Sequence, residues 1–156
     1  MPNLGDADIT TKEDFGIQNV YLKDTSFETP HSPEIFREQW QPNLDLEITN
    51  DIKNLEENIY EVVLHITATV KAKDKTAFLV EVQQAGIFTL KGFTPDNLAY
   101  MLNSYCPTLL FPFARETISS LVSRGGFQPL WLAPINFDAL YAEQMEKQKE
   151  AQNPTN

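Results

Sequence analysis

The sequence predicts a single α+β domain, in which a four-stranded antiparallel sheet has its helices packed on one side. Three observations lead to this prediction. In the first half of the 156-residue chain, apolar and polar side chains alternate, as they do in strands with one buried face. In the second half, apolar side chains recur every three or four residues, as they do in amphipathic helices. Short connections between the expected strands favour antiparallel pairing of neighbours.

We expect this domain to span residues 15–147, between two polar tails. Residues 1–14 are acidic and are predicted to be disordered, and residues 148–156 are predicted to be flexible. The expected strands cover residues 15–28, 40–49, 59–70 and 76–88. The first is expected to be long and bulged, and its pattern places Phe15, Tyr21 and Phe27 on one face.

The expected connections between these strands carry the usual loop residues. A loop with two prolines covers residues 29–33, a polar connection covers 50–58 and a charged turn covers 71–75.

The first helix should begin at Thr94-Pro95-Asp96, which supplies a hydroxyl cap, a proline at the first helical position and an acid in the first turn. We expect this helix to run to Tyr105 and to be interrupted by Cys106-Pro107.

A second helix covers residues 110–122, and Pro112 should kink it or mark its restart. Gly125-Gly126 is expected to end it. A last helix over residues 137–147 should be capped by Asn136 or Asp138.

The composition excludes several classes of protein. A formal net charge of -10 opposes binding to nucleic acid and to anionic membrane surfaces. The first residues lack the cationic start and apolar stretch of a signal peptide, and the longest apolar runs fall short of the roughly 20 residues that span a bilayer. Cys106 is the one cysteine, which fits a reducing compartment. We therefore expect a soluble cytoplasmic protein.

The candidate catalytic and metal-binding residues are few. The two histidines are His31, in the proline loop, and His65, on the polar face of an expected strand. They form no cluster with metal-ligand spacing. Cys106 precedes a proline in an apolar setting, which is typical of a small buried hydrophobe. The sequence therefore predicts neither an enzyme nor a metal or cofactor site.

Residues 105–141 combine seven aromatic side chains with four prolines, a composition suited to making apolar surface and fixing its shape. Two interpretations are open: this segment closes the core, or it binds a ligand. Trp40 has the same ambiguity.

A second group of side chains is acidic. Asp24, Glu28 and Glu81 lie opposite the apolar faces of their strands, and they would form a patch around Leu79 if those strands were adjacent. The alternative is an ordinary solvated sheet face.

Four stretches of the chain carry a resemblance to a known family. They are YLKDTSFETP at 21–30, FREQWQPNLDLEI at 36–48, EVQQAGIF at 81–88 and the aromatic stretch 105–141. Together they closely resemble SecB, the family of bacterial protein-export chaperones. The similarity covers roughly residues 15–142 in the same order and spacing.

The resemblance implies a cytosolic homotetramer, a dimer of dimers, that holds unfolded preproteins in apolar grooves until the SecA translocation ATPase receives them. The resemblance further implies that such a chaperone uses no nucleotide or metal. The alternatives are a SecB-like chaperone associated with a toxin–antitoxin system and, from another class, a protein that binds a small apolar ligand.

The resemblance also implies roles for three sets of residues. The SecA-binding residues are Asp24, Glu28, Leu79 and Glu81. The candidates for the client groove are Trp40, Phe127, Leu130, Trp131 and Leu132. The candidates for oligomerisation are Phe78, Val80, Val82 and Gln84.

Overall fold

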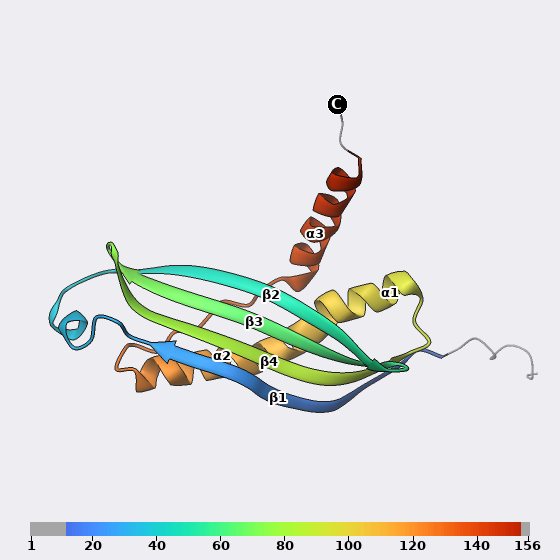
Figure 1. The fold of residues 1–156 in the computed structure, drawn as a ribbon, viewed down its shortest axis with the longest axis horizontal. Helices are drawn as coiled ribbons and strands as arrows, with labels where there is room; N and C mark the ends of the chain where they lie inside the picture. Colours follow the sequence, from blue (N-terminus) through green and yellow to red (C-terminus); the bar gives the residue numbers. More distant parts are fainter. Residues whose placement is uncertain (1–11, 154–156) are drawn as a thin grey trace, which may run out of the picture.

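The computed structural model describes residues 12–153, and residues 1–11 of the tail predicted for residues 1–14 lie outside them. Within the described residues, four strands form one antiparallel sheet in the order β1-β4-β3-β2 (Figure 1). The strands are β1 (Asp14–Glu28), β2 (Pro42–Glu56), β3 (Ile59–Ala72) and β4 (Lys75–Lys91). The predicted fold class, α+β with a four-stranded antiparallel sheet, is confirmed.

The strands are longer than the sequence pattern predicts. β2 begins at Pro42 and continues to Glu56, through most of the stretch expected to be a polar connection. Its side chains from Asp51 onward are exposed because β2 is an edge strand, while its backbone still pairs with β3, Asn54 lying opposite Tyr60. The prediction of a polar connection over residues 50–58 is therefore wrong for most of this stretch. Backbone hydrogen bonding at an exposed edge strand does not require apolar side chains.

β1 begins at Asp14, which the sequence placed in the disordered tail, and two irregularities confirm that it is bulged. They lie between Ile17 and Asn19 and between Leu22 and Asp24. Each extra residue shifts the faces of the side chains that follow it.

The helical half begins as predicted. Helix α1 (Pro95–Tyr100) is capped by Thr94, whose Oγ1 accepts a hydrogen bond from the Asn97 amide at 3.2 Å. A π-helical turn, η2 (Met101–Tyr105), then leads directly into α2 (Cys106–Arg124).

The interruption expected at Cys106-Pro107 is wrong. The Cys106 amide reaches back to the Met101 carbonyl, so the helix widens at this point and continues past the proline, which lacks an N–H. Pro112 likewise lies inside α2, and no new helix begins there. Gly125 ends α2 as predicted, and Gly126 follows with a φ of 92°.

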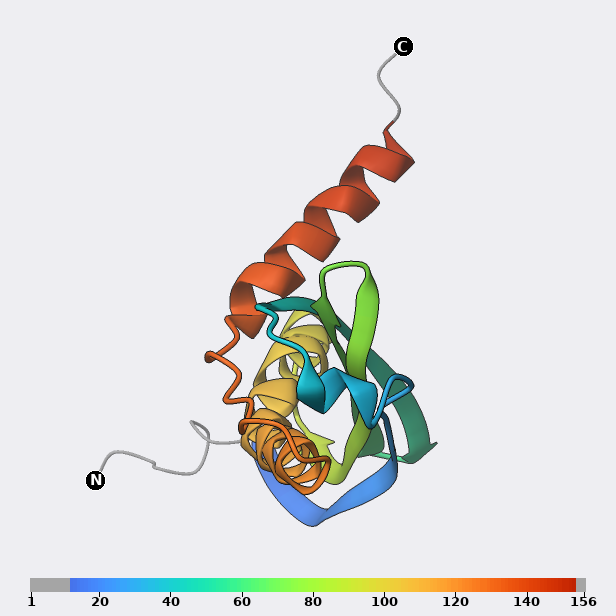
Figure 2. The same ribbon diagram turned by 90° about the vertical axis from the view of Figure 1, so that its left-hand side faces the viewer.

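Helices α1 and α2 lie along one face of the sheet (Figure 2), and the apolar core lies between these helices and the sheet. Helix α3 (Phe137–Gln152) instead projects away from the body of the domain (Figures 1 and 2). Of the two candidate N-caps, Asn136 caps the helix, since its Oδ1 accepts a hydrogen bond from the Ala139 amide at 3.0 Å. Residues 148–152, predicted as part of a flexible tail, continue this helix, because Lys, Glu, Ala and Gln are good helix formers. In residues 12–153 no helix combines the length and apolarity needed to cross a bilayer.

Candidate client pocket and docking surface

An aromatic pocket lies at the end of the sheet where β3 and β4 meet the loop after α2. It has a volume of about 310 Å³. Its lining residues are Trp40, Pro42, Val70, Phe78, Phe127, Gln128, Pro129 and Leu130. We call these residues the aromatic pocket.

Phe127 is the centre of this pocket. Its ring centroid lies 4.8 Å from that of Phe78, 5.0 Å from that of Phe36 and 6.3 Å from that of Trp40. The Trp40 indole Nε1 donates to the Ile35 carbonyl at 3.1 Å, which fixes the ring's polar edge and leaves its apolar body to the pocket. The walls are therefore held in place by the protein's own packing.

Three of the five groove candidates, Trp40, Phe127 and Leu130, line this pocket. The other two do not: Trp131 is 69% exposed away from it, and Leu132 is 4% exposed within the core. Adjacent residues of an extended segment point in opposite directions, so consecutive apolar side chains cannot all face one pocket.

The sequence analysis assigned Phe78 to oligomerisation and not to this pocket, and it missed Phe36, which packs against Phe127. Phe36 stands four residues before Trp40, a spacing that could have signalled a shared face on a helical turn. The structure places it in the 3₁₀ turn η1 (Glu34–Arg37), against Phe127.

The oligomerisation candidates do not form a surface in the single chain. Phe78, Val80, Val82 and Gln84 are all at most 4% exposed, on the face of β4 that the helices cover. Gln84 is satisfied locally, since its Nε2 donates to the Tyr21 carbonyl at 3.0 Å. A change at these positions would therefore act first on the packing of α2.

The opposite face of β4 carries the acidic candidates. Strands β1 and β4 are adjacent and antiparallel, with Glu28 opposite Leu79, and Ser26 opposite Glu81. Asp24 lies opposite Gln83, the next outward residue along β4. The structure thus brings together Asp24, Glu28, Leu79 and Glu81, and we call these four the acidic surface. The three acids are exposed and Leu79 is half-buried.

The two bulges of β1 decide which of its residues share this face. Tyr21 lies opposite Ala85, on the outer face, whereas Phe15 and Phe27 lie opposite the buried Leu90 and Val80. The prediction that Phe15, Tyr21 and Phe27 share a face is therefore wrong, because the bulges reverse the parity between them.

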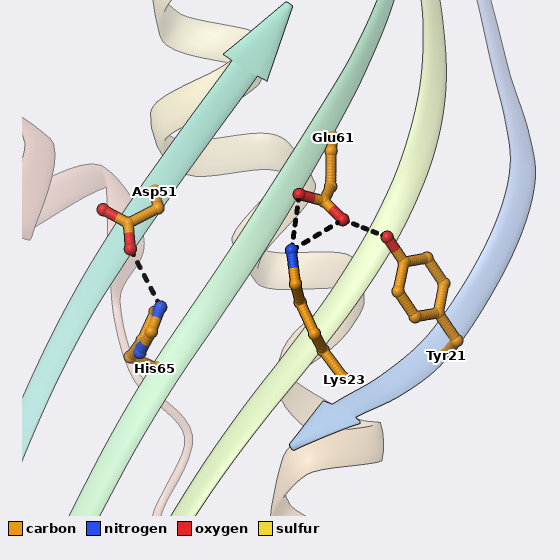
Figure 3. A network of polar contacts seen from close by, with 5 residues as sticks. All are labelled: Tyr21, Lys23, Asp51, Glu61 and His65. Atoms are coloured by element: carbon orange, nitrogen blue, oxygen red, sulfur yellow. Dashed lines mark hydrogen bonds and ion pairs between the residues drawn. The ribbon is translucent and has the colours of Figure 1, made fainter. Parts of the chain in front are cut away.

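Beside the acidic surface lies a network of polar contacts that sequence reasoning also missed (Figure 3). Lys23 Nζ lies 2.9 Å from Glu61 Oε1 and 3.1 Å from Oε2, and the Tyr21 hydroxyl donates to the same carboxylate. The hydrogen bond from Tyr21, and then the one from Lys23, hold the pKa of Glu61 below its ordinary value. Burial, followed by the Glu61 carboxylate, raises the pKa of Tyr21 to about 12. No sequence signal joins these residues, because they are 38 to 40 positions apart.

His65 and Cys106, which the sequence analysis considered for catalysis or metal binding, have structural surroundings. His65 Nε2 lies 2.9 Å from Asp51 Oδ2 on the same outer face (Figure 3). Cys106 is fully buried, and burial raises the pKa of its thiol to about 12, so it has little thiolate with which to react. Within residues 12–153 no cluster of three or more His, Cys, Asp or Glu side chains could hold a metal ion.

Comparison with known proteins identifies clear relatives. Residues 8–148 match the family profile described as "Preprotein translocase subunit SecB". The chain is 54% identical to the protein-export protein SecB of Nitrosococcus oceani, over 88% of this chain and 85% of that protein. It is 49% identical to the protein of the same name from Methylococcus capsulatus, over 90% of both chains.

A solved structure shares the fold. It is a SecB-like chaperone of Mycobacterium tuberculosis in complex with a ChAD peptide from the HigA1 antitoxin. The match has a TM-score of 0.65 at 16% sequence identity and covers 78% of this chain and 90% of that one.

Proposed function

Because this chain belongs to the SecB family, we propose that it is a chaperone of protein export. It holds preproteins unfolded in the cytoplasm without ATP and delivers them to the SecA translocation ATPase. The relatives at about half identity are named for protein export, which favours this role over one in a toxin–antitoxin system.

The aromatic pocket is the observation that carries the holding function. Trp40, Phe127 and Leu130 offer apolar contact, while Pro42 and Pro129 stiffen the surrounding segments. A stiff wall lowers the ordering cost of binding. One such pocket takes an apolar side chain of any client, and several pockets acting on one long chain give affinity through multivalency. By binding unfolded chains preferentially, the protein would draw them away from folding without ATP.

Assembly into a homotetramer, a dimer of dimers, would place several such pockets on one particle. In support, β1 is an edge strand, and its Ile17 and Leu22 are 51% and 46% exposed. Tyr105 and Phe113, on the helical layer, are 40% and 48% exposed. Exposed edge strands and apolar side chains are commonly covered by another copy.

The acidic surface is the proposed docking site for SecA. Asp24, Glu28 and Glu81 surround the half-buried Leu79 on a face that the helices leave open. Acidic groups around an apolar centre suit a cationic segment, whose charges steer the encounter and fix its register.

The test of the holding function is suppression of aggregation. The protein is mixed with a chemically denatured preprotein, diluted without ATP and followed by light scattering, and the mass of the native particle is measured alone and with the client. We expect a tetramer that suppresses scattering in proportion to its concentration.

Trp40→Ala combined with Leu130→Ala should suppress scattering much less, because each anchor contributes up to about 1.5–3 kcal/mol when fully buried. Trp131→Ala, which removes an aromatic ring outside the pocket, is the matched control and should behave as the parent. Equal suppression by the double variant and the parent, at unchanged particle mass, would rule out the aromatic pocket as the client site.

A further inference from the structure

The acidic surface has a cation beside it. Lys23 precedes Asp24 in β1, and neighbouring residues of a regular strand point to opposite faces. The bulge between Leu22 and Asp24 removes this separation, since Lys23 is the extra residue and both it and Asp24 reach the outer face. The ammonium group of Lys23 could therefore neutralise Asp24.

The structure shows Lys23 turned away from Asp24. Its ammonium group contacts both oxygens of Glu61, which lies on β3, on the far side of β4 (Figure 3). The side chain of Glu61 is only 12% exposed, against 45% for that of Lys23. Glu61 is thus the fixed member of the pair, and the long lysine reaches across to it.

Tyr21 fixes Glu61 in turn. The tyrosine lies opposite Ala85 of β4, a residue small enough for a ring to pass over it, and its hydroxyl meets Glu61 from the same side as Lys23 (Figure 3). The lowered pKa of Glu61 keeps its carboxylate charged and able to hold Lys23.

The pairing of Lys23 with Glu61 leaves the charges of the outer face unevenly distributed. Within residues 12–153, the lysine–carboxylate ion pair of this face is that of Lys23 with Glu61, and the His65 imidazole contacts the Asp51 carboxylate. Lys53, a further cation, lies opposite Glu61 on β2. Lys23 and Lys53 therefore both lie next to Glu61, and none of the ion pairs among the described residues involves Asp24, Glu28 or Glu81.

We propose that Glu61, oriented by Tyr21, is a positioning residue that holds Lys23 away from Asp24, so that the acidic surface stays unneutralised for a cationic partner. The identity of that partner as SecA rests on the proposed function. The holding of Lys23 does not.

The experiment compares three variants with the parent by titration at low salt, using two probes. One probe is SecA, and the other is a hexalysine peptide, which reports the charge of the face independently of SecA. Glu61→Gln removes one negative charge and releases Lys23. Glu47→Gln is the matched control, because it removes one negative charge from the exposed outer side of β2 without releasing a lysine. Glu61→Gln combined with Lys23→Gln removes the released cation as well.

We expect Glu61→Gln to weaken binding of both probes about fivefold, which is the upper range for a new exposed ion pair. Glu47→Gln should weaken it less than twofold, and the double variant should return to the affinity of the parent. The rescue by Lys23→Gln is the readout that a merely structural role of Glu61 would not give. Circular dichroism and thermal melting check the fold, and if Glu61→Gln does not fold, Glu61→Asp keeps the charge, shortens the reach to Lys23 and should show the same loss and rescue.

The outcomes separate the two proposals. If Glu61→Gln matches Glu47→Gln, or if Lys23→Gln gives no rescue with hexalysine, Glu61 does not position Lys23. If hexalysine shows the loss and the rescue while SecA binds all variants equally, the positioning holds and the docking of SecA on this face is wrong.

Discussion

The two faces of β4 place alternate residues of one strand in opposite environments. Phe78, Val80 and Val82 are buried beneath the helices, while Leu79 and Glu81 look outward from the same stretch of backbone. On the inner face these three side chains are at most 4% exposed within one chain. On the outer face Glu81 is charged and exposed, and Leu79 is half-buried. We therefore expect stability to depend on the inner face and the proposed charge-based recognition to depend on the outer face.

Val82→Asp should have the largest effect on stability. The side chain is 1% exposed and sits among apolar neighbours, so an unpaired charge there should cost about 5 kcal/mol or more. We expect loss of cooperative unfolding and of the assembled particle, measured by circular dichroism and light scattering. The adjacent Glu81→Gln, on the outer face, should change the free energy of unfolding by less than about 0.5 kcal/mol. Similar losses from both changes would contradict the division into two faces.

Phe127→Ala should have the next largest effect. Its ring contacts Phe78, Phe36 and Trp40, and its removal opens a cavity in the aromatic pocket. Because Phe127 is only half-buried, we expect a cost of about 3 kcal/mol, at the low end for such a change. Urea unfolding measures this as a lower midpoint at an unchanged slope. Trp131→Ala is the control, and a shift as large as that of Phe127→Ala would show that the loop is packed differently.

The Tyr21 network should give a smaller, pH-dependent effect. The pKa of Tyr21 is raised from 10.0 to about 12 in the folded protein, so folding favours the protonated phenol. This contribution to stability is fully present below pH 10 and is lost as the pH rises towards 12. The difference in unfolding free energy between the parent and Tyr21→Phe should therefore shrink over that interval, while phenolate absorbance reports the titration. A difference that stays constant across this range would show that burial and the Glu61 carboxylate do not raise the pKa of Tyr21.

The smallest effect on stability is expected from Asp24→Asn combined with Glu81→Gln. Both side chains are exposed and outside the ion pairs of the described residues, so the free energy of unfolding should change by less than about 0.5 kcal/mol. Binding to SecA should nevertheless be lost, and in the parent it should weaken as salt rises, because the screening length is about 8 Å at physiological ionic strength. Asp45→Asn with Glu47→Gln removes the same charge from β2 and is the control. Retained binding of the Asp24 and Glu81 variant at low salt would remove the docking role.

Local rules were reliable where the cause of a structure is local. The hydroxyl of Thr94 and the ring of Pro95 favour a helix start, and the structure begins α1 there. The same rules failed at Pro107, where the backbone absorbs the proline through a π-helical turn, and at Asn50, where a polar sequence continues a strand because β3 supplies the hydrogen-bond partners. Propensity describes the cost of a conformation, and neighbouring elements can offset that cost.

The sequence by itself determined the alternation of β4, and with it the separation of Val80 and Val82 from Leu79 and Glu81, because a strand's side chains have a period of two wherever it pairs. Only the tertiary structure decided what these faces meet. The order β1-β4-β3-β2 sets Glu28 opposite Leu79 and brings Lys23 within reach of Glu61, and the fold gathers Trp40, Phe78 and Phe127 around one pocket. These residues are distant in the chain, and a contact of that kind is fixed by strand order, register and packing, which no local pattern specifies.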